Sequence, residues 1–338
     1  MVIRYGIMAR PNTIAEAVGD AILAEQQGFD LLGVSDSQSV YRELYVTLSA
    51  CAGATSRLLL APAVTNPVTR HPAVAASAIA SVADLAGGRT IFGIGSGNNA
   101  VLNLSERPAG LAGLRDYITA VRDLLATGKA VYRGRELAMS WSGFNVPIYM
   151  SAEGPKTLEL AGEIADGVIV NPGLQPELIH DVLRSIRTGA ERVGRDIAEI
   201  DIWMIVRVNV CDDAAAGVAA ITMELASNAH HVFRFTTDGK RLPDGLVDAV
   251  RRVQAGYVPA QHEHIGGANA VLLRREPELL GYLAERFAVV GPPEACAAKL
   301  RAAAGAGIGN FLFTGFVADR PALMRALGER VVPLVAGT

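Results

Sequence analysis

The chain has 338 residues, of which 50% are hydrophobic and only 19% are charged. Such a composition supplies a large apolar core, so it excludes an intrinsically disordered protein. The formal net charge is −3, whereas proteins that grip nucleic acid need a strong positive field, so nucleic acid is not an expected partner. Any phosphate group must therefore be held by a local site.

The sequence shows no signal for export or membrane insertion. Its first residues begin directly as a strand, without the basic and apolar regions of a signal peptide. The Ala-rich stretch at 73–86 is interrupted by polar residues and is too short to cross a bilayer. Cys51, Cys211 and Cys296 are far apart and lack metal-site spacing, which is typical of buried thiols in a reducing compartment. We therefore expect a cytoplasmic protein with no membrane partner.

Short β-branched or apolar runs alternate with segments of helical periodicity, which predicts βα units on a parallel sheet. Helices are clear at residues 15–27, which Gly28 follows, and at 155–165, which Pro155 opens. The predicted strands are residues 2–8, 31–35, 58–64, 90–95, 147–151, 167–170, 201–209 and 309–314. Eight such strands predict a (β/α)₈ (TIM) barrel that occupies residues 1–338 as a single domain.

The alternation is broken only between residues 212 and 287, which predicts an insertion after the seventh strand. The insertion contains helical patterns at 213–228 and 243–256 and a polar turn at 261–267. We expect it to form a lid or substrate wall over the barrel mouth. The triplet His262-Glu263-His264 in the turn points its two imidazoles apart, so no metal is expected.

In this fold, functional residues gather where strands end and βα loops begin. Small or polar residues follow the second, third, fourth and fifth predicted strands, at 33–37, 61–67, 93–98 and 151–156. Gly95, Gly97 and Gly154 allow backbone amides to approach a ligand, and Pro155 opens a helix whose N-terminus favours anions. Each feature alone is also ordinary turn chemistry. Together they predict a cradle for a phosphorylated cofactor.

These motifs, in their order and spacing, resemble the luciferase-like flavin/deazaflavin superfamily, and within it the coenzyme F420-dependent methylenetetrahydromethanopterin reductase branch. The resemblance covers most of the chain outside the insertion. It is carried by SD at 35–36, AVTNP at 63–67 with RHPA at 70–73, ADLAGGR at 83–89 leading into FGIGSG at 92–97, and SAEGPKT at 151–157 leading into AGEIADG at 161–167.

The resemblance implies a (β/α)₈ oxidoreductase that transfers a hydride between a deazaflavin, coenzyme F420, and a small organic substrate. The ring would lie at the barrel mouth, with Asp36 facing its reactive edge and with Ala63, Val64 and Thr65 backing or edging it. Lys156 supplies a local positive charge for an extended anionic tail. The other expected cofactor-binding residues are Gly95, Ser96, Gly97, Ser151, Ala152, Glu153 and Gly154.

The catalytic candidates are Asp36, Ser37 and His71. Asp36 can pass a proton or bind a polar substrate edge, or it can merely cap the following helix. Several deazaflavin-dependent relatives carry a His where this chain has Ser37, and a hydroxyl cannot replace an imidazole as acid or base near neutral pH. This departure weakens a sugar-phosphate dehydrogenase assignment. Arg70 and His71 are solvated loop residues or functional ones, and His71 is the better candidate for a proton donor.

Two other functions remain open. The first alternative is an FMN-dependent luciferase-like monooxygenase, in which reduced flavin reacts with dioxygen at the same mouth. The second is a barrel that binds a phosphorylated ligand without turnover, as a sensor or accessory subunit, because a fold does not secure an activity.

The third predicted strand contains a proline that should interrupt its pairing. Pro62 has no amide hydrogen for a parallel ladder, so regular pairing should break near Ala63 and Val64. The resemblance implies that this bulge contains a cis peptide at Ala63–Val64 and bears on the back of the cofactor ring.

Two predicted helices are rich in small residues, which predicts either a homodimer or close packing of these helices on their own barrel. The small residues are Ala50, Ala52, Gly53 and Ala54 on one helix, and Ala73, Ala75, Ala76, Ala78 and Ala80 on the other.

Overall fold

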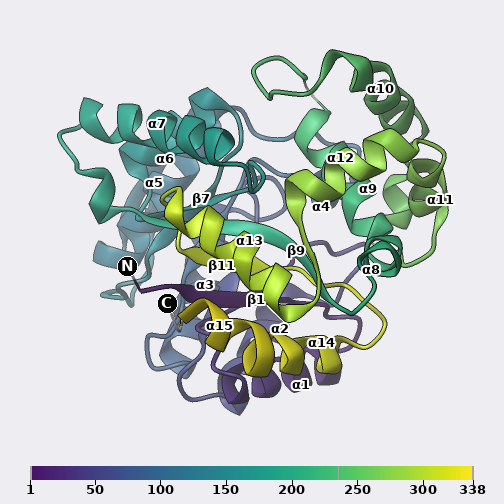
Figure 1. Ribbon diagram of the computed structural model, residues 1–338. Helices are drawn as coiled ribbons and strands as arrows, with labels where there is room; N and C mark the ends of the chain where they lie inside the picture. The colour runs from purple at the N-terminus through teal and green to yellow at the C-terminus, as the bar shows by residue number, and fades with distance from the viewer. Residues whose placement is uncertain (1, 235, 263, 337–338) are drawn as a thin grey trace. The chain divides into compact units, whose positions relative to one another are not determined.

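The structure is a computed structural model that describes residues 2–234, 236–262 and 264–336, along which strands and helices alternate (Figure 1). The chain forms two compact units, which are described separately. The N-terminal unit comprises Tyr5–Val170 and Arg184–Trp203, and the C-terminal unit comprises Met1–Arg4, Asn171–Leu183 and Met204–Thr338. That the whole chain forms a single domain stays a prediction.

The N-terminal unit is built on a parallel sheet. Its strands are β1 (Arg4–Ala9), β2 (Leu31–Val34), β3 (Leu59–Pro62), β4 (Phe92–Ile94), β7 (Ile148–Ser151) and β8 (Gly167–Val170). The pairs β1–β2, β2–β3, β4–β7 and β7–β8 are all parallel. Parallel bridges from Leu60 to Thr90 and from Thr65 to Ile94 join the third and fourth strands. The carboxyl ends of these strands therefore lie at one edge of the sheet.

Helices connect the strands of the N-terminal unit. They are α1 (Ile14–Gln26), α2 (Leu44–Ala54), α3 (Pro72–Leu85), α4 (Asn99–Leu102), α5 (Leu111–Thr127), α6 (Pro155–Ile164), α7 (Pro176–Arg192, which continues from the C-terminal unit) and the short η1 (Ile197–Glu199). Thr13 caps α1 by accepting a hydrogen bond from the Glu16 amide, and Gly28 follows the helix with a φ of 77°. The helices predicted at 15–27 and 155–165 thus match α1 and α6 to within one residue.

Two glycines of this unit lie where backbones approach closely. A Cβ on Gly93 of β4 would lie 2.0 Å from the Pro62 carbonyl oxygen, so glycine allows β4 to lie against the end of β3. A Cβ on Gly162 of α6 would lie 2.1 Å from the Ile186 carbonyl oxygen of α7. The second glycine allows these two helices to pack backbone against backbone.

The C-terminal unit contains β9 (Asp201–Val210, which begins in the N-terminal unit), β10 (Ala288–Gly291) and β11 (Asn310–Phe313). β10 pairs in parallel with β9, and the Thr314 amide after β11 donates to the Val206 carbonyl oxygen of β9 at 3.0 Å. The helices are α8 (Ala214–Ala220), α9 (Thr222–Phe233), η2 (Asp244–Leu246), α10 (Val247–Gly256), η3 (Pro259–Gln261), α11 (Ala268–Arg274), α12 (Pro277–Phe287), α13 (Pro293–Gly305), α14 (Arg320–Ala326), η4 (Leu327–Val331) and α15 (Val332–Ala336).

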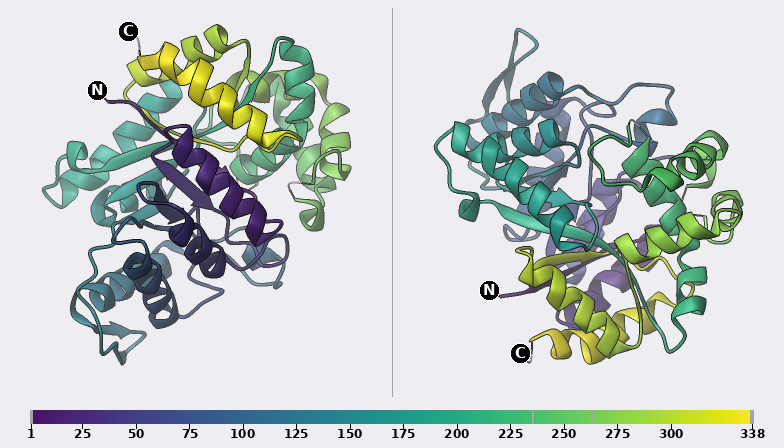
Figure 2. Two further views of the ribbon diagram at one scale, coloured as in Figure 1. Left: turned by 90° about the horizontal axis from the view of Figure 1, so that it is seen from below. Right: turned by 45° about the horizontal axis from the view of Figure 1, so that its top comes forward.

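The described residues of the segment predicted as an insertion, 212–287, form helices joined by turns and contain no strand. Its helices pack on one another around α9 (Figure 2). Leu225, Val253 and Leu283, on α9, α10 and α12, are fully buried in a hydrophobic cluster of their own. The segment therefore has its own core, and its role as a lid stays a prediction.

Every strand predicted from the sequence overlaps an observed strand, and the βα alternation of both units is that of a (β/α)₈ barrel, as predicted. The sequence analysis missed β10 and a hairpin of β5 (Lys129–Tyr132) with β6 (Arg135–Ala138). The hairpin turns at Arg133 and Gly134, both with positive φ. Within the described residues, no helix has the length and apolar character needed to span a bilayer.

Candidate functional site

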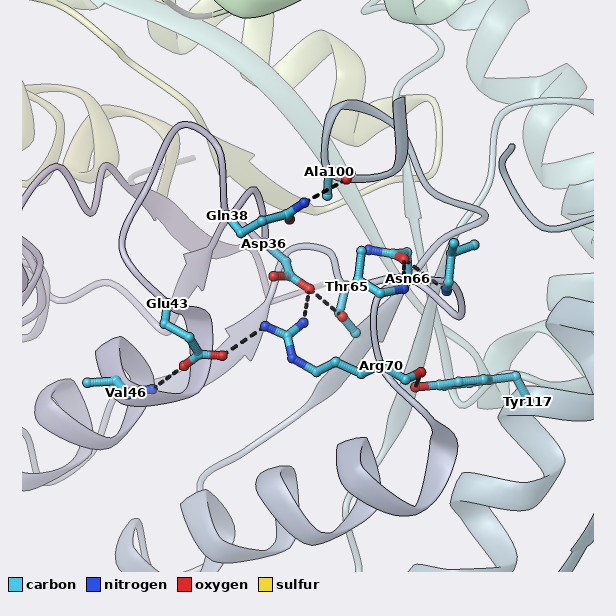
Figure 3. Close-up of polar contacts among 11 residues, drawn as sticks. Asp36, Gln38, Glu43, Val46, Thr65, Asn66, Arg70, Ala100 and Tyr117 are labelled. Atoms are coloured by element: carbon cyan, nitrogen blue, oxygen red, sulfur yellow. Dashed lines mark hydrogen bonds and ion pairs between the residues drawn. The ribbon is translucent and has the colours of Figure 1, made fainter. Parts of the chain in front are cut away.

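The loops that were predicted to form the site follow β2, β3, β4 and β7 of the N-terminal unit, so the parallel sheet brings them to one edge. Hydrogen bonds join the loops after β2, β3 and β4 directly (Figure 3). The Gln38 side-chain amide after β2 donates to the Ala100 carbonyl oxygen after β4 at 2.8 Å. Thr65 after β3 donates to Asp36 after β2 at 2.6 Å.

Asp36 is the most buried charged group at this edge, with its side chain only 2% exposed. Its Oδ2 accepts hydrogen bonds from Thr65 Oγ1 at 2.6 Å and from Arg70 Nη1 at 2.5 Å. These two hydrogen bonds, one of them charge-assisted, hold the carboxylate in one orientation. Asp36 is not the cap of the following helix: Glu43 fills that role on α2, where its Oε2 accepts from the Val46 amide at 2.8 Å.

Arg70 links two carboxylates and is not a freely solvated loop residue. Its Nη1 binds Asp36, and its Nη2 binds Glu43 Oε1 at 2.8 Å, as Figure 3 shows. The guanidinium carbon also lies 5.1 Å from the centre of the Tyr45 ring. Burial opposes the charged form, but the hydrogen bonds and charges of Asp36 and Glu43 raise the pKa of Arg70 above its usual value. The arginine is therefore cationic at any physiological pH.

The backbone that carries Arg70 is held in place by two side chains. Asn66 Oδ1 accepts from the Val68 and Thr69 amides, both at 2.9 Å, which closes a tight turn after β3. The Tyr117 hydroxyl, on α5, donates to the Arg70 carbonyl oxygen at 3.1 Å. Burial raises the pKa of Tyr117, so this phenol remains a donor.

Ser37 is buried and hydrogen-bonded to a residue that the sequence analysis missed. Asn99, the first residue of α4, donates from Nδ2 to Ser37 Oγ at 3.1 Å, and Asn103 donates to Asn99 Oδ1 at 3.2 Å. The only local signal for Asn99 is a polar residue just after the glycine-rich end of the fourth predicted strand.

His71 lies at the exposed start of α3. Its Nδ1 accepts from the Ala73 amide at 3.3 Å, and its ring meets Tyr132 edge to face at 5.5 Å between centroids. Within the described residues, no hydrogen bond joins His71 to Asp36 or Ser37. Its role as a proton donor stays a prediction, and the contacts seen are those of a helix cap.

The end of β3 has the predicted shape. The strand ends at Pro62, and the Ala63–Val64 peptide is cis. Pairing resumes where the Thr65 amide donates to the Gly93 carbonyl oxygen at 3.0 Å. Ala63 and Val64 are half-buried, so both keep apolar surface at this edge.

The glycine-rich loops fit a phosphorylated cofactor. Gly154 caps α6 without a side-chain hydrogen bond, and nothing lies within 4 Å of where its Cβ would be. The first amides of α6 are thus open to an anion. Lys156 is exposed beside them, whereas Gly95 is buried against Val64. The remaining cradle residues are Ser96, Gly97, Ser151 and Glu153, all half-buried, and Ala152, which is buried.

The C-terminal unit has a polar cluster of its own. Asn171 after β8 donates to Asn228 of α9 at 2.5 Å and accepts from Arg207 of β9 at 2.7 Å. Glu224 of α9 accepts hydrogen bonds from the Thr314 hydroxyl and the Phe316 amide. Among the described residues, no cluster of His, Cys, Asp and Glu could hold a metal ion. Glu263, of the predicted polar turn, lies outside those residues.

Comparison with known proteins places these features in a family. The luciferase-like monooxygenase family matches residues 2–310. A 5,10-methylenetetrahydromethanopterin reductase of Methanolobus tindarius is 34% identical over 294 residues, which cover 83% of this chain and 84% of that protein.

Two solved structures share the fold over nearly the whole chain. The coenzyme F420-dependent tetrahydromethanopterin reductase of Methanopyrus kandleri has a TM-score of 0.78 at 23% identity and covers 98% of this chain and 99% of its own. The oxygenating constituent of 3,6-diketocamphane monooxygenase of Pseudomonas putida, in complex with FMN, has a TM-score of 0.69 at 16% identity and covers 99% of both chains. Because the family match spans most of its length, the chain belongs to the luciferase-like monooxygenase family of oxidoreductases.

Proposed function

We propose that this protein transfers a hydride between coenzyme F420, a 5-deazaflavin, and a small organic substrate. The main support is the 34% identity to a methylenetetrahydromethanopterin reductase over 83% of the chain. The solved coenzyme F420-dependent tetrahydromethanopterin reductase shares the fold. The site geometry is compatible with this cofactor.

The residues of the N-terminal unit divide between the ring and the tail of such a cofactor. The half-buried Ala63 and Val64 would back the ring, with Asp36 and Thr65 at its polar edge. The open start of α6, with Gly154 and exposed Lys156, would hold a phosphate-bearing anionic tail. Gly95, Ser96, Gly97, Ser151, Ala152 and Glu153 would complete this cradle.

When bound, the deazaflavin supplies two-electron hydride transfer. The protein supplies position and electrostatics. Ala63 and Val64 exclude water from one side of the ring site, and Asp36 offers a carboxylate oxygen at its edge. Ser37 can donate a hydrogen bond to a substrate oxygen, whereas it cannot withdraw a proton near neutral pH.

The alternative is an FMN-dependent monooxygenase, which the fold of the FMN-bound Pseudomonas putida enzyme supports. The same edge and the same cradle would hold FMN. The two proposals differ at the tail, because an extended anionic tail reaches past the α6 start towards Lys156, whereas FMN ends at its phosphate.

The deciding experiment is a titration of the purified protein with each oxidised cofactor. We expect the deazaflavin to bind at least about tenfold more tightly than FMN, a difference of about 1.4 kcal/mol. Lys156→Ala should weaken deazaflavin binding and leave FMN binding nearly unchanged. The opposite order of affinities would favour the monooxygenase. Tight binding without reduction by any organic donor would favour a non-catalytic role.

A further inference from the structure

Helix α9 of the C-terminal unit has a polar face that is buried. Its apolar face packs in the hydrophobic cluster of that unit through Ile221, Leu225, Ala229 and Val232. Glu224, Ser227 and Asn228 follow the i, i+3, i+4 spacing of a second face, and all three are buried. Buried polar groups cost free energy unless they are hydrogen-bonded. Polar residues that break the apolar pattern of a core occur at functional sites, so this polar face is a candidate binding site.

A chain of hydrogen bonds leads from β9 to this polar face. Arg207 of β9 donates from Nη1 to Asn171 Oδ1 at 2.7 Å, and Asn171 donates from Nδ2 to Asn228 Oδ1 at 2.5 Å. A guanidinium can only donate, so the Asn171 atom that faces Arg207 must be the carbonyl oxygen. The other end of the Asn171 amide is then its NH₂ group, and the Asn228 atom that faces it must also be an oxygen. Arg207 therefore fixes the direction of both amides.

The chain ends at the Nδ2 amide nitrogen of Asn228. Asn228 is 0% exposed, and within the described residues its Nδ2 is buried without a hydrogen-bond partner. This nitrogen carries two N–H donors, and buried donors that stay unpaired are costly. A ligand that brings an acceptor to them gains hydrogen bonds without displacing an existing partner.

The polar face lies beside strand ends. Asn171 directly follows β8, and Thr314 directly follows β11. In (β/α)₈ barrels the active site forms at the carboxyl ends of the strands. Glu224, one turn before Asn228 on α9, accepts hydrogen bonds from the Thr314 hydroxyl and the Phe316 amide. These bonds fasten α9 to the loop after β11 and so hold Asn228 at that end of the strands.

We propose that Asn228 binds an sp² oxygen of the organic substrate, that of a carbonyl or a carboxylate group, and that Arg207 and Asn171 are positioning residues that orient its amide. Such an oxygen has lone pairs and no proton, so it matches a group that can only donate. The guanidinium at the start of the chain polarises the amides in the direction that strengthens the last donor. This inference rests on the proposed function in that the ligand is the substrate, and it deepens that function by naming a substrate class.

The first test needs no cofactor. Protein labelled with ¹⁵N at asparagine shows the Asn228 side-chain amide by NMR, with the signal assigned by its loss in Asn228→Asp. The probes are cyclopentanone, cyclopentanecarboxylate and, as a ring without an acceptor, cyclopentane. We expect at least one oxygen probe to shift the Asn228 amide protons downfield in a saturable way. Cyclopentane should not shift them, and no probe should shift the exposed Asn145 amide.

The two oxygen probes distinguish the sources of the oxygen. Tighter binding of cyclopentanone would assign the site to a carbonyl group, and tighter binding of cyclopentanecarboxylate would assign it to an acid. The probe that binds should also raise the melting temperature of the wild type, because it binds the folded chain. It should not raise the melting temperature of Asn228→Asp.

Two variants test the direction of the chain. Asn228→Asp keeps the oxygen that Asn171 uses and replaces the donor by a second oxygen, so it should weaken binding of the oxygen probe about tenfold or more. Asn171→Asp should weaken it as much although Asn228 stays in place. Its new carboxylate oxygen would face Asn228 and draw the Asn228 NH₂ group towards itself, away from the ligand. A merely structural role for Asn171 would lower stability without this loss of affinity.

Asn209→Asp is the matched control. Asn209 lies on β9 in the same unit and donates to the Gly217 carbonyl oxygen at 3.2 Å, outside the chain of three residues. This variant should leave the affinity for the probe unchanged. If Asn228→Asp fails to fold, the Asn228 signal is assigned by through-bond correlation, and the wild-type titration with Asn171→Asp decides the test.

Three results would overturn the proposal: no shift of the Asn228 amide with either oxygen probe, an equal shift with cyclopentane, or equal affinity in the wild type and Asn171→Asp. Failure of the proposed function looks different. A folded wild type that binds neither deazaflavin nor FMN would reject the cofactor assignment, while the probe titration would still decide whether Asn228 binds an oxygen.

Discussion

Asn99 donates its side-chain amide to the hydroxyl oxygen of Ser37 at 3.1 Å, and both residues are buried. A hydroxyl that accepts one hydrogen bond keeps its single proton available for another acceptor. Asn99 therefore turns Ser37 into a donor at the position where several deazaflavin-dependent relatives carry a His.

Ser37→Ala should lower turnover about tenfold, because one neutral hydrogen bond contributes about 0.5 to 1.5 kcal/mol. Ser39→Ala is the matched control, since Ser39 is exposed in the same loop. The wild-type rate should be nearly flat between about pH 6 and pH 8, because no imidazole occupies this position. If the wild-type rate instead changes with pH in this range, and this change disappears in His71→Asn, His71 would be the proton donor.

Gly154→Ala should weaken cofactor binding and leave the fold intact. Nothing lies within 4 Å of the added Cβ and the backbone φ of −85° suits alanine, so the methyl group fills only the space in front of the α6 amides. We expect a dissociation constant raised about tenfold or more, as for a displaced phosphate contact of about 1.4 kcal/mol. Isothermal titration measures this change.

Two other glycines serve as controls for that experiment. Gly110 caps α5 with a similar φ of −72° and equally open space, so Gly110→Ala should change melting temperature as little as Gly154→Ala and should not affect cofactor binding. Gly97 has a φ of 107°, and its Cβ would lie 2.5 Å from Val101 Cγ2. Gly97→Ala should therefore destabilise the fold by about 1 to 3 kcal/mol. Equal binding losses in Gly154→Ala and Gly110→Ala would argue against a phosphate at α6.

His230 should make stability depend on pH. Burial, helped by the charge of Arg234, lowers the pKa of His230 from 6.5 to about 4. The unfolded chain takes up this proton at higher pH than the folded chain does. The stability that the buried, neutral His230 contributes is therefore complete above about pH 6.5 and is lost as the pH falls towards about 4. His230→Phe keeps a ring to stack on Tyr257, 4.0 Å away between centroids, and removes the titration.

The measurement is the melting temperature of wild type and His230→Phe across this pH window. The wild type should lose stability more steeply as the solution becomes acid. Parallel curves for the two proteins would show that His230 does not carry the effect.

A homodimer through α2 and α3 is expected from small and apolar surface residues. Val46 of α2 is 58% exposed and Val74 of α3 is 57% exposed, beside the partly open Ala50, Gly53 and Ala78. Apolar side chains on such a face are typical of an interface between copies. Light scattering should give twice the monomer mass, and Val46→Glu with Val74→Glu should give a monomer.

The competing explanation for these small residues is packing inside one chain. Ala52, Ala75, Ala76 and Ala80 are buried within their own unit and fit that explanation. If the wild type is a monomer at micromolar concentration, packing within one chain would explain all of these small residues. Val131→Glu is the control, because Val131 is exposed on the β5–β6 hairpin and outside the proposed interface.

The sequence by itself determined the strands, the main helices and the loops that carry the site. Pro62 ends β3, Gly28 ends α1 and Pro155 starts α6, each through the backbone of one residue. Hydrophobic runs of the right length placed the barrel strands. The β5–β6 hairpin escaped prediction because its strands are short and half exposed, with no apolar pattern that distinguishes them from a loop.

The tertiary structure alone decided which side chains meet. Asp36 and Arg70 are 34 positions apart, Ser37 and Asn99 are 62 apart, and Arg70 and Tyr117 are 47 apart. Propensity and periodicity act between neighbours along the chain, so they carry no information about such pairs. Parallel strands bring their carboxyl ends to one edge, and packing then fixes which donor reaches which acceptor. That is why Asp36 was predicted at the site, while its pairing with Arg70 could be recognised only in the fold.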